Sequence, residues 1–181
     1  MTIGLRFIVT FAILSVTVAL AGDDAVGWKE NGTNIVESAV MKAKNGFGAQ
    51  IWLIDDERFF DEWNKPMPGV EVKPVKRATR GKPIFAVILF AGSAGGSNGL
   101  CNVTGDIVVR RPDGKKYGDI TDANFWQKLP PPETCQLQLG VQYLGIRIET
   151  KDPSGKYTVK ATVVDKITGT VLRLATDFVV D

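Results

Sequence analysis

The stretch that decides the fold is residues 155–181, which read Gly155-Lys156-Tyr157-Thr158-Val159-Lys160-Ala161-Thr162-Val163-Val164-Asp165-Lys166-Ile167-Thr168-Gly169-Thr170-Val171-Leu172-Arg173-Leu174-Ala175-Thr176-Asp177-Phe178-Val179-Val180-Asp181. Apolar residues alternate from Tyr157 to Val163 and again from Leu172 to Val180. Since side chains of a strand alternate between the two faces of a sheet, each run has one apolar face. The two runs and the short loop between them predict a β-hairpin that closes an antiparallel sheet, with Tyr157 and Phe178 pointing inward.

Other elements are expected upstream of this hairpin. The apolar run Ile84–Phe90 lies between Pro83 and Gly92 and predicts a central strand that is buried on both faces. The segment 51–54 is typical of a strand, and the aromatic residues that follow it at helical spacing predict one or two helical turns. We expect a long surface connection over 119–134, because three consecutive prolines lie near its end.

Residues 137–150 carry two apolar alternations of opposite phase. A change of phase by one residue is what a β-bulge produces, although two short strands that meet at a bend would give the same pattern. The sequence leaves both alternatives open.

The segment 152–165, together with Phe178-Val179-Val180 at the end of the chain, resembles the last two strands of bacterial immunoglobulin-like domains. Macroglobulin-type modules have a similar ending. The resemblance implies a mainly β fold, namely an antiparallel immunoglobulin-like β-sandwich over 84–181. Residues 22–83 are then expected to form a short α/irregular N-terminal segment with a basic linker, and 22–181 one compact unit.

The first 21 residues are typical of a secretory signal peptide. Arg6 precedes the mostly apolar stretch 7–20, and Ala19-Leu20-Ala21 has the small residues that a signal peptidase recognises. We expect cleavage before Gly22 and a periplasmic or secreted protein with no stable membrane span. An uncleaved signal anchor is the alternative, but the apolar stretch is shorter than the roughly 20 residues of a membrane helix.

The charge of the chain is close to balanced. It has 22 basic and 20 acidic residues, and loss of Arg6 with the signal peptide would leave a net charge of +1. Nucleic acid is therefore not expected as a partner, because binding to phosphates needs a concentrated excess of Lys and Arg. A protein and a polysaccharide are the partners left as candidates.

The only two cysteines are Cys101 and Cys135. In an exported chain an even number of cysteines usually indicates a disulfide, so we predict a Cys101–Cys135 bridge. Two buried thiols that lie too far apart to be joined are the alternative.

The chain contains no histidine. This removes histidine-based catalytic triads and most zinc sites, and no catalytic, metal-binding or cofactor-binding motif is recognisable. The sequence therefore predicts no cofactor and a protein that is not an enzyme. Catalysis by two carboxylates would not need histidine, and the place to look for it, or for a calcium site, is the acidic cluster within 55–62. A solvated helix face is the simpler interpretation of that cluster.

Three further groups are candidates for contact with a ligand. The aromatic residues Trp52, Phe59, Phe60 and Trp63 could stack on a sugar, but anchoring of a short helix on a sheet is more usual. Phe125 and Trp126 precede the three prolines, where Trp126 could contact a partner or plug the open end of a sandwich. The basic stretch 73–82 could contact an anionic polymer or be a solvated linker.

These observations predict an exported, non-enzymatic binding or structural module. The first alternative is a secreted carboxylate-dependent hydrolase or calcium-binding protein centred on 55–62. The second is an inhibitor or chaperone that offers an edge strand to its partner.

Overall fold

The computed structural model describes residues 36–63, 65, 74–133 and 136–181, and the backbone of the short strands at 16–18, 28–30 and 33–34. The predicted signal peptide and its cleavage site lie largely outside the described residues. Within the described residues, no helix is both long and apolar enough to cross a membrane. The described chain is mainly β, which confirms the coarse fold class.

The described strands form three sheets. A small sheet contains β1 (Val16–Val18), β2 (Trp28–Glu30) and β3 (Thr33–Asn34). The second, which we call the β7 sheet, has the order β10 (Gln138–Leu139), β7 (Pro83–Ala91), β5 (Phe47–Ile54) and β4 (Met41–Lys44), and β11 (Leu144–Arg147) also pairs with β7. The third, the β12 sheet, has the order β6 (Arg77–Ala78), β13 (Thr170–Val180), β12 (Gly155–Asp165), β8 (Asn102–Arg110) and β9 (Lys116–Gln127).

The C-terminal hairpin forms as the alternation predicts. β12 and β13 pair antiparallel from Gly155 opposite Val180 to Asp165 opposite Thr170. Tyr157 lies opposite Phe178, both are 0% exposed, and their rings stack with centroids 5.2 Å apart. The inward orientation of both residues is therefore confirmed.

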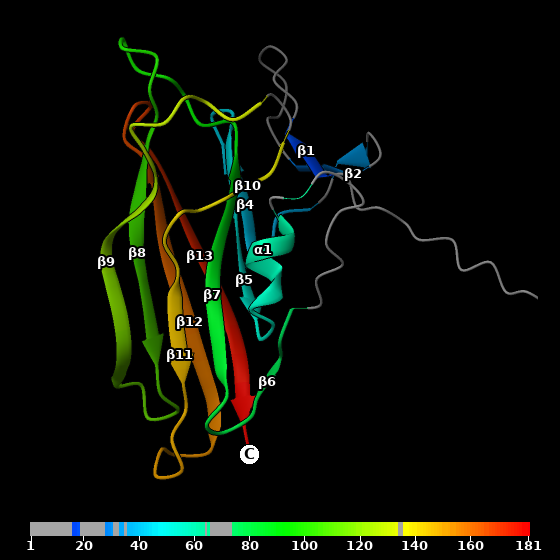
Figure 1. Cartoon of the computed structure of the whole chain (residues 1–181), viewed down its shortest axis with the longest axis vertical. Helices are drawn as coiled ribbons and strands as arrows, with labels where there is room; N and C mark the ends of the chain where they lie inside the picture. The colour runs from blue at the N-terminus through cyan, green and yellow to red at the C-terminus, as the bar shows by residue number, and fades with distance from the viewer. Residues whose placement is uncertain are drawn as a thin grey trace, which may run out of the picture.

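The main core lies between the β7 sheet and the β12 sheet, which are the two layers visible in Figure 1. The long strands β5, β7 and β12 contribute every second residue to it, as the pleat requires. The largest side chains that are fully buried are Phe47, Ile51, Leu53, Ile84, Ile88, Leu89, Phe90, Ile107, Phe125, Tyr157 and Phe178.

β7 is buried on both faces, as its continuous apolar run predicts. Ile84, Ala86 and Ile88 face the main core, while Phe85 and Val87 face a second cluster under the helix α1 (Arg58–Trp63). Figure 1 shows α1 on the outer side of the β7 sheet. The helix residue Phe59 is 3% exposed and belongs to this cluster, which explains the position of the helix.

The structure differs from the sequence-based expectations in two regions, and in a third it decides between two alternatives that the sequence left open. The surface connection expected over 119–134 is wrong in its first half, because β9 continues to Gln127. Residues 137–150 form two short strands, β10 and β11, separated by a bend, so the alternative of a bulge within one strand is not what forms. The described part of the N-terminal segment contributes strands to both main sheets: β4 and β5 lie in the β7 sheet, and β6 in the basic stretch pairs parallel with β13.

A polar network closes the end of the molecule that carries the C-terminus (Figure 1). Arg80 Nη1 donates to the carbonyl oxygens of Glu149 (2.8 Å) and Asp152 (2.9 Å). The Tyr117 hydroxyl lies 2.6 Å from both Asp152 Oδ2 and the Arg147 carbonyl oxygen, and Glu149 N also donates to Asp152 Oδ2 (2.8 Å). These bonds fix the loop between β11 and β12.

The charge of Asp152 is part of this closure, which gives the protein a predicted acid sensitivity. The hydrogen bonds from Tyr117 and from the Glu149 amide hold the pKa of Asp152 below its usual value of 3.8. A group whose pKa is lowered on folding stabilises the native state above its unfolded pKa, and this contribution disappears as the pH falls through the folded pKa. We therefore expect the stability to decline below about pH 4, and the decline to be smaller in Asp152→Asn. Urea melts of both proteins between pH 2 and 6 would measure this, and parallel pH profiles would contradict it.

Candidate functional site

The acidic cluster at 55–62 is a solvated surface. Asp55, Glu57, Asp61 and Glu62 are exposed, and Asp56 is engaged by its neighbour Arg58, whose Nη2 lies 2.6 Å from Asp56 Oδ2. The hydrogen bonds from Arg58 lower the pKa of Asp56. Among the described residues, no group of three or more His, Cys, Asp or Glu side chains is placed to hold a metal ion. The cluster therefore shows neither a cleft with paired carboxylates nor a cation cage.

The aromatic residues around α1 anchor the helix. Phe60 stacks on Tyr143 with centroids 4.4 Å apart and meets Phe85 edge-on at 5.4 Å, while Phe59 contacts Trp63 at 5.3 Å. Their contacts are with one another and with the outer face of the β7 sheet, which is the core-anchoring interpretation. Tyr143 is the most exposed member, at 40%.

Phe125 and Trp126 lie at the end of β9 and pack inward. Phe125 is 0% exposed, so its ring has no surface for a partner. The Trp126 ring is half-buried against Phe90, with centroids 5.9 Å apart, and its Nε1 donates to the Pro130 carbonyl oxygen (2.8 Å). The contacts of Trp126 are therefore with Phe90 and Pro130 of the same chain, which agrees with the interpretation that Trp126 closes the open end between the two sheets.

The basic stretch is partly used within the fold. Arg77 forms an ion pair with Asp181 (2.8 Å), and Arg80 belongs to the closing network described above. Residues 71–73 lie outside the described residues, so the fate of Lys73 is not described. The described arginines hold the C-terminal strand rather than form an isolated basic linker.

Cys101 is buried, with its Sγ 3.4 Å from Ser93 Oγ. Cys135 lies outside the described residues, so the Cys101–Cys135 bridge stays a prediction. The glycine-containing loop around Ser93 packs on the β12–β13 turn, where Ala94 N donates to Asp165 Oδ2 (3.2 Å).

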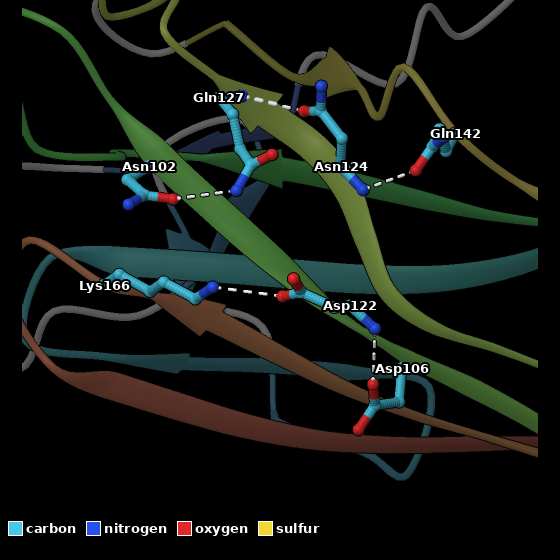
Figure 2. A network of polar contacts seen from close by, with 7 residues as sticks. All are labelled: Asn102, Asp106, Asp122, Asn124, Gln127, Gln142 and Lys166. Atoms are coloured by element: carbon cyan, nitrogen blue, oxygen red, sulfur yellow. Dashed lines mark hydrogen bonds and ion pairs between the residues drawn. The ribbon is translucent and has the colours of Figure 1, made fainter.

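A polar network covers the outer side of β8 and β9, as Figure 2 shows. The pairing of these strands is irregular at three places, and at one of them Asp122 has a left-handed backbone with φ +46°. Asp122 N donates to Asp106 Oδ1 (2.9 Å), and Lys166 Nζ lies 3.0 Å from Asp122 Oδ1. Residues other than glycine rarely adopt this conformation, so these bonds compensate for local strain.

The amide half of the same network holds the end of β9. Gln142 Oε1 accepts from Asn124 N (2.6 Å), Asn124 Oδ1 accepts from Gln127 N (2.9 Å), and Gln127 Nε2 donates to Asn102 Oδ1 (3.2 Å) (Figure 2). Each of these side chains is paired with another part of the protein. The network therefore explains how a strand with irregular pairing is held in place, and it offers few free groups to a ligand.

A basic hollow lies on the outer face of the β12 sheet, near the turn between β8 and β9. Its volume is about 450 Å³. The residues that line it are Arg110, Arg111, Pro112, Gly114, Lys156, Thr158 and Lys160. Four of these seven are cationic, and none of the seven is acidic.

The strand pattern produces this hollow. Lys156, Thr158 and Lys160 share the outward parity of β12, so their Cα atoms are about 7 Å apart in sequence order. Arg110 of β8 lies directly opposite Thr158, so its side chain shares the outward face of the sheet. A short side chain thus stands between three long cationic ones, and the space above Thr158 stays open.

The cations are only partly compensated. Lys156 Nζ lies 3.4 Å from Asp177 Oδ2, and Arg111 Nε lies 3.7 Å from Asp113 Oδ1, which is beyond hydrogen-bond distance. The Arg111 Nε atom is buried and has no hydrogen-bond partner among the described residues. Arg110 donates to the Gly114 carbonyl oxygen (3.0 Å), and within the part of the chain that the structure describes no carboxylate pairs with its charge. An anion is the ligand that would satisfy these groups.

The sequence-based interpretation did not find this site. It assigned the basic residues of interest to 73–82. The alternation Lys156-x-Thr158-x-Lys160 was the available signal, but the position of Arg110 opposite Thr158 depends on strand register, which the sequence does not give.

Comparisons with known proteins give a distant structural likeness. No family model matches the chain, and no curated protein shows significant similarity to it. Among solved structures, a family 123 glycoside hydrolase from Clostridium perfringens, studied for the hydrolysis of glycolipid glycans, is similar with a TM-score of 0.44 and 15% identity. The match covers 76% of this chain and 27% of the hydrolase chain, so this chain spans about a quarter of that enzyme's length.

This finding overturns the prediction that the chain is not an enzyme, because the similar protein is a hydrolase. That prediction is withdrawn. A likeness of this size assigns neither an activity nor a substrate to the present chain.

Proposed function

We propose that the chain is an exported binding module that holds an anionic ligand on the outer face of its β12 sheet. The observation that carries the proposal is the hollow lined by four cationic side chains and by no carboxylate. Export rests on the signal-peptide pattern of residues 1–21. In this proposal the two sheets are an immunoglobulin-like β-sandwich that presents the binding face.

The outer face of the β12 sheet suits this role because it is rigid and open. Its strands are long and pair over most of their length, so the cations project from a fixed frame. A site on strands is held more precisely than a site on loops, which favours a preorganised arrangement of charges. The overall charge is only slightly positive, so attraction of an anion must come from the local cluster.

The edge-strand alternative receives less support. β9 is an edge of the β12 sheet, but it is interrupted by bulges and carries Lys116, Asp119 and Asp122. Charges and bulges on an edge strand are features by which proteins prevent pairing with other chains. The sheet face is therefore the better candidate for the contact surface.

Binding of a charged polysaccharide would test the proposal. We expect the full chain to bind dextran sulfate but not uncharged dextran, with an affinity that falls as salt is raised, since surface charges are screened. The double variant Lys156→Gln/Lys160→Gln should lose about tenfold or more in affinity, because each exposed cation contributes up to about 1 kcal/mol. Titration calorimetry at two salt concentrations would measure both effects.

Arg173→Gln is the matched control. Arg173 is exposed on the same sheet face, opposite Thr162, but does not line the hollow. The substitution removes one positive charge outside the proposed site, and we expect it to change the affinity for dextran sulfate by less than twofold. An equal loss per charge in Arg173→Gln and in the double variant would mean that binding is diffuse, and the proposed site would be wrong.

A further inference from the structure

We infer that the hollow accepts a phosphate or sulfate ester carried by a sugar, and that Thr158 contributes to its recognition. This inference rests on the proposed function and names the class of ligand for the same site. It depends on three properties of the hollow: the directions from which its donors come, its charge and its size.

The donors lie on three sides of Thr158. Lys156 and Lys160 flank it along β12, and Arg110 lies across from it on β8, while Asp177 lies across from it on β13. Phosphate and sulfate esters present three terminal oxygens, which can accept from several donors at once. A carboxylate is planar with two oxygens and is best held by the fork of one arginine. The arrangement around Thr158 fits the tetrahedral group better.

The charge of the hollow also fits. The four cations have two nearby carboxylates, Asp113 and Asp177, so two positive charges remain uncompensated. A phosphate monoester carries a charge of about −1.5 to −2 near neutral pH, whereas a carboxylate or a sulfate ester carries −1, so the charge favours a phosphate ester. The lysine of the Lys156–Asp177 ion pair is 67% exposed, so breaking this pair to bind a ligand costs little free energy.

The hollow is large enough to hold part of the molecule that bears the anionic group as well as the group itself. Its volume of about 450 Å³ lies within the range of roughly 300–1,000 Å³ that is typical of sites for small organic molecules. Pro112 and Gly114 form part of the wall beside the cationic side chains. These features favour a polar carrier such as a sugar.

A phospholipid headgroup in a membrane is less suitable. Insertion into a lipid surface needs exposed apolar side chains beside the basic residues. The large apolar residues of the β12 sheet and its turn that are exposed are Ile167 and Val171, at the opposite end of the hairpin from Lys156. The surroundings of the hollow therefore favour a soluble ligand.

The test compares four probes on the full chain by titration calorimetry: glucose 6-phosphate, inorganic sulfate, glucuronate and glucose. We expect glucose 6-phosphate to bind at least tenfold more tightly than glucuronate, sulfate to bind more weakly than glucose 6-phosphate, and glucose not to bind. Thr158→Val keeps a β-branched side chain in the strand but removes the hydroxyl. This variant should bind glucose 6-phosphate about tenfold more weakly, as expected for the loss of one hydrogen bond to a charged group. Its affinity for glucuronate should be unchanged.

Equal affinities for glucose 6-phosphate and glucuronate, or no effect of Thr158→Val on a chain with an unchanged melting temperature, would overturn the inference. If the inference failed in this way but dextran sulfate still bound through Lys156 and Lys160, the proposed function would stand and only the assignment of the ligand class would be wrong. Binding to vesicles that contain phosphatidic acid but not to glucose 6-phosphate would also overturn the inference, in favour of a lipid surface.

Discussion

Phe178→Ala should lower the free energy of unfolding by about 3–5 kcal/mol, which is the usual cost of truncating a buried phenylalanine. The Phe178 side chain is 0% exposed and stacks on Tyr157 at an interplanar angle of 15°. Truncation would remove this contact and leave a cavity between the two sheets. A typical domain has a total stability of about 5–15 kcal/mol, so the variant would keep only part of it. Urea denaturation followed by circular dichroism would measure the loss.

Lys160→Ala is the control for that experiment. Lys160 lies on the outward face of β12, is exposed, and neighbours the inward residues of the same strand. We expect it to change the stability by less than about 0.5 kcal/mol, as is usual for exposed positions. Comparable losses in Phe178→Ala and Lys160→Ala would show that the assignment of the two faces is wrong.

The hairpin that contains these residues could be predicted because its signal is local. Every second residue from Tyr157 to Val163 is apolar, and a one-residue error would turn the whole set outward, so the pattern permits only one orientation. The same reasoning worked for the apolar run of β7. Its continuous hydrophobicity reflects two buried faces, one toward the main core and one toward α1.

The strand β9 could not be predicted in this way. It contains Asp119, Asp122 and Asn124, and register shifts interrupt the alternation. The polar residues are satisfied by contacts with Asp106, Lys166 and other partners that are distant in sequence (Figure 2). A local pattern cannot show such contacts, so the strand looked like a surface connection.

The basic hollow was missed for a related reason. Lys156 and Lys160 belong to a recognisable alternation, but their significance depends on the register that brings Arg110 opposite Thr158. Register is decided by the packing of both sheets and not by either strand alone. The sequence therefore identified the strand that carries the candidate site but not the site.

Asp165→Ala should also destabilise the protein strongly, by about 3–5 kcal/mol. Asp165 is 0% exposed at the end of β12, and its carboxylate accepts three hydrogen bonds. The donors are Ala94 N (3.2 Å), Ile167 N (2.9 Å) and Thr168 Oγ1 (3.1 Å). A hydrogen bond to a charged group contributes about 1.5–3 kcal/mol. The three donors are only partly buried and regain part of this free energy from water, so we expect a loss near the lower end of the range. Urea melts would measure the loss.

Asp165→Asn separates the hydrogen bonds from the shape of the side chain. The asparagine has nearly the same volume and keeps one acceptor oxygen, so it can hold either the β12–β13 turn through Ile167 N or the loop through Ala94 N, but not both. We expect it to lose about half as much stability as Asp165→Ala. Hydrogen exchange at the Ala94 and Ile167 amides would identify which contact survives, because the released amide should exchange faster than in the unsubstituted protein. A loss below about 1 kcal/mol in Asp165→Ala, with both amides still protected, would show that the carboxylate does not join the loop to the turn.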